Sequence, residues 1–168
     1  MNQAQIQLQE LIELIQRLRA PDGCPWDRKQ TRQDIGKYLQ DECYEVLDAL
    51  AENDAAHLRE ELGDLLFQIL FIAEISAESG EFSLSDVMKD IREKMIRRHP
   101  HVFGDVTVRS VQEVKDNWQE IKKKERGEAT AGGNIFDGIP RSMPALKRAL
   151  KISAAASRLG FDWPDVFG

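Results

Sequence analysis

The amino-acid sequence predicts an all-α protein, and three observations support this prediction. Apolar residues recur at three- and four-residue spacing over most of the 168 residues, which is the period of an amphipathic helix. No stretch alternates apolar and polar residues over enough length to indicate a strand. Capping and turn-forming residues divide the periodic segments into separate helices.

The first half of the chain predicts three helices. The first has apolar positions from Ile6 to Leu18 and stops at the turn-rich segment 20–25. The second begins after Thr31, and Asn53 and Asp54 break its pattern before the third helix starts. A connection this short indicates an antiparallel hairpin of two long helices. The third helix ends at Gly80, and its expected core positions include Leu62 and Leu65.

Further helices are predicted after Gly80. A fourth, capped by Ser83 or Ser85, ends before Pro100 and has three positions that are expected to be buried: Val87, Ile91 and Met95. Residues 99–109 are expected to be irregular. Ser110 opens a capping-box pattern for a fifth helix. A short sixth helix is expected from Pro144 through Leu159. These elements predict a domain over 1–126, a flexible linker over 127–138 and a helical tail over 139–168, which leads toward a further domain if the chain is part of a longer protein.

The charge balance excludes some partners. The chain has 23 basic and 29 acidic residues and a formal net charge of -6. Proteins that bind a nucleic-acid backbone need basic surfaces, so no nucleic-acid partner is expected. No apolar run approaches the length of about 18 residues that a membrane span needs, and the N-terminus lacks the features of a signal peptide. The sequence therefore predicts a cytoplasmic protein without a membrane partner.

Four acidic residues are arranged symmetrically about Asn53. Glu42 and Asp64 each lie 11 residues from it, and Glu45 and Glu61 each lie 8 residues from it. An antiparallel hairpin would therefore bring the two pairs level with each other. Partly buried carboxylates at such spacing need a compensating cation, and oxygen ligands select Mg²⁺ first and Mn²⁺ next.

These acids have two other possible interpretations. Charged residues three apart are often a solvated helix face with salt bridges, but the mirrored spacing favours a metal site. A di-iron bundle would need Glu-x-x-His pairs, which are absent, and the three histidines fall outside the pattern: His57, His99 and His101.

Magnesium that is held by few protein ligands leaves positions for phosphate oxygens, which in turn require basic residues. Lys94 and Arg98 are four apart on the fourth helix, and Trp118 and Lys122 are four apart on the fifth. Two alternatives stay open at this point. Basic residues are also favoured at a helix C-terminus by the helix dipole, and Trp118 is also a candidate core residue.

The sequence resembles the MazG nucleoside triphosphate pyrophosphohydrolases nearly from end to end. The matching segments are Asp41-Glu42-Cys43-Tyr44-Glu45, Glu61-Leu62-Gly63-Asp64, and residues 24–31, 97–103, 118–122, 139–146 and 160–163. The resemblance implies an all-α pyrophosphohydrolase fold, with a helical hairpin core and a four-helix bundle that is completed by homodimerisation. It also implies Mg²⁺-dependent hydrolysis of nucleoside triphosphates to the monophosphate and pyrophosphate, in control or house-cleaning of the nucleotide pool.

The resemblance also implies roles for individual residues. The metal ligands and catalytic acids would be Glu42, Glu45, Glu61 and Asp64, and the nucleotide or phosphate contacts would be Lys94, Arg98, Trp118 and Lys122. His57 stands where a Lys can assist phosphate binding. We expect Glu45 or Glu42 to orient the attacking water and Trp118 or Trp26 to stack on the base. Two alternatives remain: a catalytically weak domain for dimerisation or partner binding in a tandem protein, and a structural metal-binding bundle.

Overall fold

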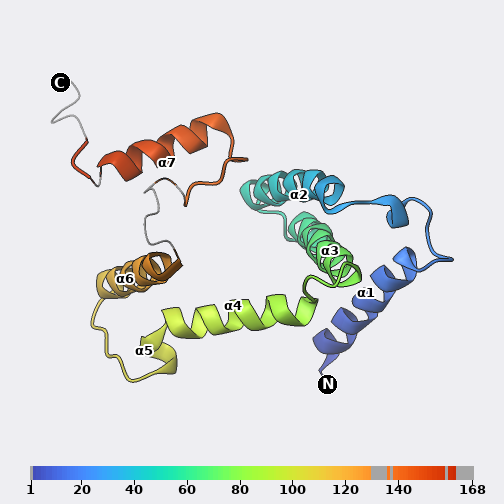
Figure 1. The fold of residues 1–168 in the computed structure, drawn as a ribbon, viewed down its shortest axis with the longest axis horizontal. Coiled ribbons are helices and arrows are strands. Elements are labelled where there is room, and N and C mark those ends of the chain that lie inside the picture. Colours follow the sequence, from blue (N-terminus) through green and yellow to red (C-terminus); the bar gives the residue numbers. More distant parts are fainter. Residues whose placement is uncertain (1, 130–135, 137, 158, 162–168) are drawn as a thin grey trace. The chain divides into compact units, whose positions relative to one another are not determined.

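The computed structural model describes residues 2–129, 136, 138–157 and 159–161, and every regular element in these ranges is helical (Figure 1). The predicted all-α class is therefore confirmed. The chain divides into two compact units, residues 1–95 and residues 96–168. None of the helices in the described ranges is long and apolar enough to cross a membrane.

The first unit is built on a helical hairpin. Its elements are α1 (Gln3–Arg19), the 3-10 turn η1 (Asp27–Lys29), α2 (Arg32–Glu52), α3 (Ala55–Glu78) and most of α4 (Leu84–Arg98). Helices α2 and α3 pack side by side, and α1 packs against α3 (Figure 1). This is the hairpin that the short connection between the second and third helices predicted.

Local capping determines the two ends of the hairpin connection. Asn53 ends α2 in the left-handed conformation, with φ of 57°, which is a common way to end a helix. The Asp54 carboxylate then accepts hydrogen bonds from the backbone N–H groups of Ala56 and His57 at 2.8 and 3.2 Å. Such a cap begins a helix. Only Asn53 and Asp54 therefore separate α2 from α3.

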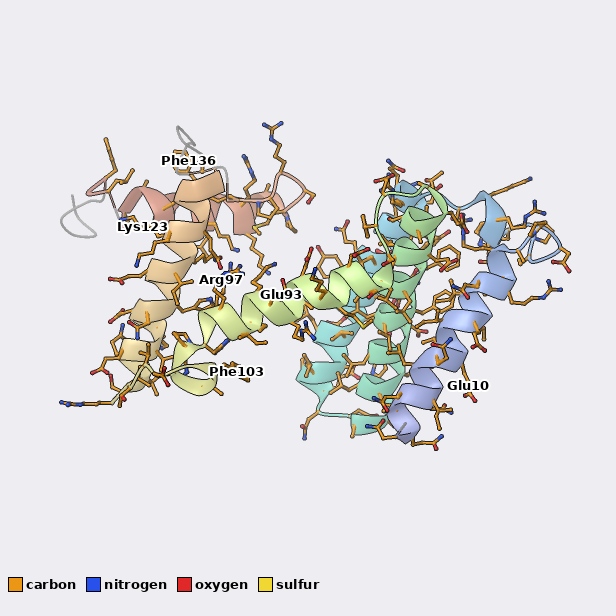
Figure 2. All side chains as sticks on the ribbon, turned by 60° about the horizontal axis from the view of Figure 1, so that its bottom comes forward. Glu10, Glu93, Arg97, Phe103, Lys123 and Phe136 are labelled. Carbon is orange, nitrogen blue, oxygen red and sulfur yellow. The ribbon has the colours of Figure 1, made fainter. Side chains whose placement is uncertain are left out.

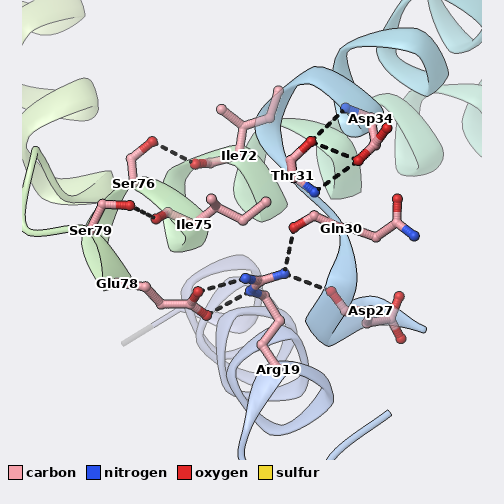
Figure 3. Close-up of polar contacts among 10 residues, drawn as sticks. All are labelled: Arg19, Asp27, Gln30, Thr31, Asp34, Ile72, Ile75, Ser76, Glu78 and Ser79. Carbon is pink, nitrogen blue, oxygen red and sulfur yellow. Dashed lines mark hydrogen bonds and ion pairs between the residues drawn. The ribbon is translucent and has the colours of Figure 1, made fainter. Parts of the chain in front are cut away.

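The core of the first unit is small and centres on Phe71, which has no exposed surface. The other buried members of this cluster come from all three long helices: Ile15, Ile35, Leu70 and Ile75. The guanidinium of Arg19 lies 5.3 Å from the centre of the Phe71 ring. Arg19 also joins the ends of α1 and α3 through Glu78 (Figure 3).

Several apolar residues that were expected in the core are exposed. Leu62 is 48% exposed, and on α4 Val87 and Ile91 are 38% and 47% exposed, so their expected burial was wrong. Helical periodicity identifies an apolar face but does not say which element covers it. Helix α1 packs against α3 of the hairpin, and four apolar side chains elsewhere on the hairpin are exposed: Leu47, Leu50, Leu66 and Ile69.

The second unit contains α5 (Pro100–Phe103), α6 (Val111–Ala129) and α7 (Ala145–Ser157). The short α5 lies where an irregular segment was expected. Pro100 occupies its first turn, where a missing N–H costs nothing. Ser110 accepts a hydrogen bond from the N–H of Glu113 at 3.1 Å, as the capping pattern predicted.

Helix α6 continues to Ala129, so the first residues of the expected linker are helical. Most of the remaining linker, residues 130–135 and 137, lies outside the described residues, as do Asp162 and Trp163 of the last matching segment. The expected division into a domain, a linker and a tail stays a prediction.

Candidate functional site

The hairpin brings three of the four symmetric acids together. Glu42 and Glu45 project from α2 and Glu61 projects from α3, and each offers a carboxylate oxygen within 4.8 Å of the others. Asp64 lies outside this group, although it follows Glu61 by three residues on the same helix. The equal sequence separations from Asn53 explain why the carboxylates lie close together, because an antiparallel hairpin aligns positions that are equally far from its turn.

Glu61 is the buried member of the cluster. It is only 7% exposed, and its Oε2 atom is buried without a hydrogen-bond partner in the described part of the chain. Burial raises the pKa of Glu61, and the nearby Glu45 carboxylate raises it further. A buried oxygen without a partner is costly in a folded protein, and a bound cation would remove that cost.

Glu42 is half-buried and is held by a neighbour on the opposite helix. The side-chain amide of Gln68 donates a hydrogen bond to Glu42 at 3.3 Å. Burial raises the pKa of Glu42 more than this hydrogen bond lowers it, and the charges of Asp64 and Glu45 raise it further. Asp64 therefore acts electrostatically on Glu42, and it raises the pKa of Glu61 in the same way.

These features fit a divalent cation better than they fit a solvated helix face. Glu45 and Asp64 are exposed, as on an ordinary polar surface, but Glu61 is buried among other carboxylates. Three carboxylates without sulfur or nitrogen donors are a ligand set for a hard ion such as Mg²⁺ or Mn²⁺. The residues present therefore fit the metal that the sequence predicted.

His57 is not a member of this cluster, as expected, but it contacts Glu61 at the edge of the cluster. Its Nδ1 hydrogen-bonds with Glu52 at 3.0 Å, and its Nε2 lies 3.1 Å from Oε1 of Glu61. The hydrogen bond with Glu52 is the main reason that the pKa of His57 is raised. The signal in the sequence was the four-residue spacing between His57 and Glu61, which places both on one helical face.

The predicted phosphate-binding residues lie on α4 and α6. Lys94 is half-buried on α4 within the first unit. In the second unit, Arg98 donates to Glu125 at 2.6 Å and Arg97 donates to the same carboxylate at 2.8 Å. These two hydrogen bonds lower the pKa of Glu125 to about 2, and the bond from Arg98 has the larger effect.

Figure 2 shows Arg97 at the end of α4 and Lys123 on α6, the two helices that Glu125 joins. Nothing local in the sequence predicted that Glu125 would pair with Arg97 and Arg98, because these residues are 28 and 27 positions away from it along the chain.

The two predicted stacking residues have different surroundings. Trp118 is 39% exposed on α6, with its ring centre 6.2 Å from that of His99. Lys122 is half-buried one turn further along α6. Trp26 is 64% exposed next to η1 in the first unit. The structure thus brings the three glutamates together, whereas Arg98, Trp118 and Lys122 belong to the other unit.

Comparisons with known proteins find relatives of this chain. Residues 30–103 match the model of the MazG nucleotide pyrophosphohydrolase domain. A nucleoside triphosphate pyrophosphohydrolase of Escherichia coli is 48% identical over 94% of this chain, and 60% of its own length is covered. A nucleoside triphosphate pyrophosphohydrolase/pyrophosphatase MazG of Thermotoga maritima is 42% identical over the whole chain, with 64% of its length covered. The chain thus spans less than two thirds of either relative.

A solved structure is also similar. The crystal structure of a mazG-related protein from Thermotoga maritima has a TM-score of 0.60 and is 31% identical. The similarity covers 68% of this chain and 98% of that one. The fold and the site define an all-helical protein with a candidate divalent-metal centre. The chain belongs to the MazG family.

Proposed function

We propose that this chain hydrolyses nucleoside triphosphates to nucleoside monophosphate and pyrophosphate, with Mg²⁺ as the cofactor and Mn²⁺ as a substitute. The main support for the proposal is that the carboxylates of Glu42, Glu45 and Glu61 lie close together on the α2–α3 hairpin of a MazG-family chain. Relatives named nucleoside triphosphate pyrophosphohydrolase, at up to 48% identity, support the same reaction. Its cellular role would be control or house-cleaning of the nucleotide pool.

In this proposal the metal is held by Glu42, Glu45 and Glu61, with Asp64 as a fourth ligand. A bound divalent ion supplies neutralisation of the triphosphate charge and activation of water. The buried Oε2 of Glu61 and the raised pKa values of Glu61 and Glu42 support this assignment. Burial and neighbouring carboxylates raise both pKa values, and a bound cation would offset that effect.

The carboxylates would also handle the proton of the attacking water. Glu45 is the exposed member of the three, which makes it the one most accessible to solvent water. Glu45, or Glu42 as the second choice, would accept this proton while the water attacks the α-phosphorus.

Lys94, Arg98 and Lys122 would stabilise the charge that develops on the leaving pyrophosphate. Trp118 or Trp26 would stack on the base, and both have exposed ring surface for this contact. Stacking reads no hydrogen-bond pattern, so it would tolerate different bases. Arg98 is already paired with Glu125, and that pairing would hold its guanidinium in place before the substrate arrives.

We also propose that the chain works as a homodimer. Five apolar residues on the hairpin are between 41% and 55% exposed: Leu47, Leu50, Leu62, Leu66 and Ile69. Exposed apolar residues on neighbouring helices indicate a contact surface when they are contiguous, and a second hairpin would complete a four-helix bundle. Sedimentation of the parent chain and of a Leu66→Lys variant tests this, since only the parent should sediment as a dimer.

Pyrophosphate release tests the activity. The chain is incubated with each nucleoside triphosphate and Mg²⁺, and monophosphate and pyrophosphate are measured as products. We expect equal amounts of both products with Mg²⁺, and none after chelation. Release of inorganic phosphate alone, or no release with any nucleotide, would reject the proposal and favour a domain for partner binding.

A further inference from the structure

Glu61 has two carboxylate oxygens in different situations. Its Oε1 lies 3.1 Å from Nε2 of His57, whereas its Oε2 is buried and has no hydrogen-bond partner among the described residues. One oxygen is therefore occupied by the protein, and the other is left for a ligand. The side chain is 9% exposed, so water has little access to it.

His57 is itself held in place. Its Nδ1 hydrogen-bonds with Glu52, the last residue of α2, at 3.0 Å. The ring therefore connects the end of α2 with the buried carboxylate on α3, across the Asn53–Asp54 connection. Both ring nitrogens have a carboxylate partner, so the ring orientation is determined by the two contacts together.

We infer that His57 is a positioning residue for the proposed metal site, where it restrains Glu61 so that its second oxygen remains available to the cation. This inference rests on the proposed function. A glutamate side chain loses conformational freedom when it is fixed in a ligand geometry, and a neighbour that fixes it beforehand reduces that loss. Partners that orient metal ligands contribute strongly to affinity in other metal sites.

A simple charge argument makes the opposite prediction. A positively charged ring beside the site would repel a metal ion, so its removal would strengthen cation binding. If His57 instead restrains Glu61, its removal should weaken cation binding. The sign of the change in metal affinity therefore distinguishes the two roles, and it can be measured without nucleotide.

The experiment titrates Mn²⁺ into the full chain by calorimetry at one pH, for the parent and three variants. His57→Leu cannot donate to Glu61 and should bind Mn²⁺ about tenfold more weakly. His57→Gln keeps an amide donor at a similar reach and should stay close to the parent. Arg59→Leu is the matched control, since it removes an exposed cation from the same turn of α3 and should not weaken binding.

Thermal melts without metal and nucleotide hydrolysis are measured on the same four proteins. A His57→Leu variant that folds and binds Mn²⁺ as tightly as the parent, or more tightly, would overturn the positioning role while leaving the proposed function standing. A His57→Gln variant as weak as His57→Leu would also overturn it. A parent chain that binds no Mn²⁺ would overturn both the positioning role and the proposed metal site.

Discussion

Arg19 and Glu78 form a bidentate ion pair between the end of α1 and the end of α3, with Nε and Nη2 each 2.6 Å from a carboxylate oxygen. The Arg19 side chain is only 8% exposed. Its Nη1 also donates to the backbone carbonyls of Asp27 and Gln30, at 2.6 and 3.3 Å (Figure 3). One guanidinium thus holds α1, η1 and α3 together.

Arg19→Met should therefore lower the free energy of unfolding by about 2 kcal/mol, because Glu78 and two carbonyl groups lose a charged donor. Urea denaturation measures the change. Arg17→Met is the matched control, since Arg17 pairs with Asp22 on the exposed surface, where ion pairs contribute little. Equal losses in both variants would contradict the role given to Arg19.

Glu61→Gln should abolish hydrolysis and keep the fold. The folded chain raises the pKa of Glu61, so ionisation of this carboxylate opposes folding when no metal is bound. A neutral amide removes that cost, and the metal-free variant should melt no lower than the parent. Mg²⁺ should raise the melting temperature of the parent but not that of Glu61→Gln. Glu60→Gln, at the exposed neighbouring position, should behave like the parent.

Lys94→Ala should reduce kcat by about 100-fold, because the leaving pyrophosphate would lose a cation in the transition state. Its melting temperature and helical circular dichroism should stay near those of the parent. Lys89→Ala changes an exposed lysine on the same helix and should leave kcat unchanged. A loss of helicity in Lys94→Ala instead would show that Lys94 serves the helix terminus.

The pairing of Glu125 with Arg97 and Arg98 should make stability depend on pH under acid conditions. The folded chain lowers the pKa of Glu125 to about 2, against about 4.3 in an unfolded chain. The pairing thus contributes its full stability at pH values above the pKa of Glu125 in the unfolded chain. This contribution is lost as the pH falls toward 2. The stability gap between the parent and Glu125→Gln should accordingly be present at pH 7 and shrink in acid. Urea denaturation at several pH values checks this, and a constant gap would contradict it.

Features with a local cause could be predicted from the sequence. Thr31, with the Asp34 carboxylate in a capping box, begins α2 as expected (Figure 3). Asn53 and Asp54 separate α2 from α3 because their own backbone and side chains make the turn. The meeting of Glu45 with Glu61 also followed from the sequence, since it requires only a short turn and equal spacing on both sides.

Features that depend on distant packing could not be predicted. Phe71 is the centre of the core, but its burial depends on contacts with α1 and α2 that no spacing reveals. Leu62 and Leu66 have core-like positions in the sequence and yet are exposed, because periodicity cannot identify a missing partner. The contact of Arg98 depends likewise on Glu125, which lies 27 residues further along the chain.

The two-residue connection between α2 and α3 limits where residues can be inserted into this chain. Exposed turns usually tolerate insertions, and Asn53 and Asp54 are both exposed. Here, however, a residue that was inserted beside Asp54 and became part of α3 would advance the positions after it by about 100° around the helix axis. Glu61 would then turn away from Glu42 and Glu45 without any change to the three residues themselves. Length variation among working relatives should therefore be tolerated in other loops before it is tolerated in this one.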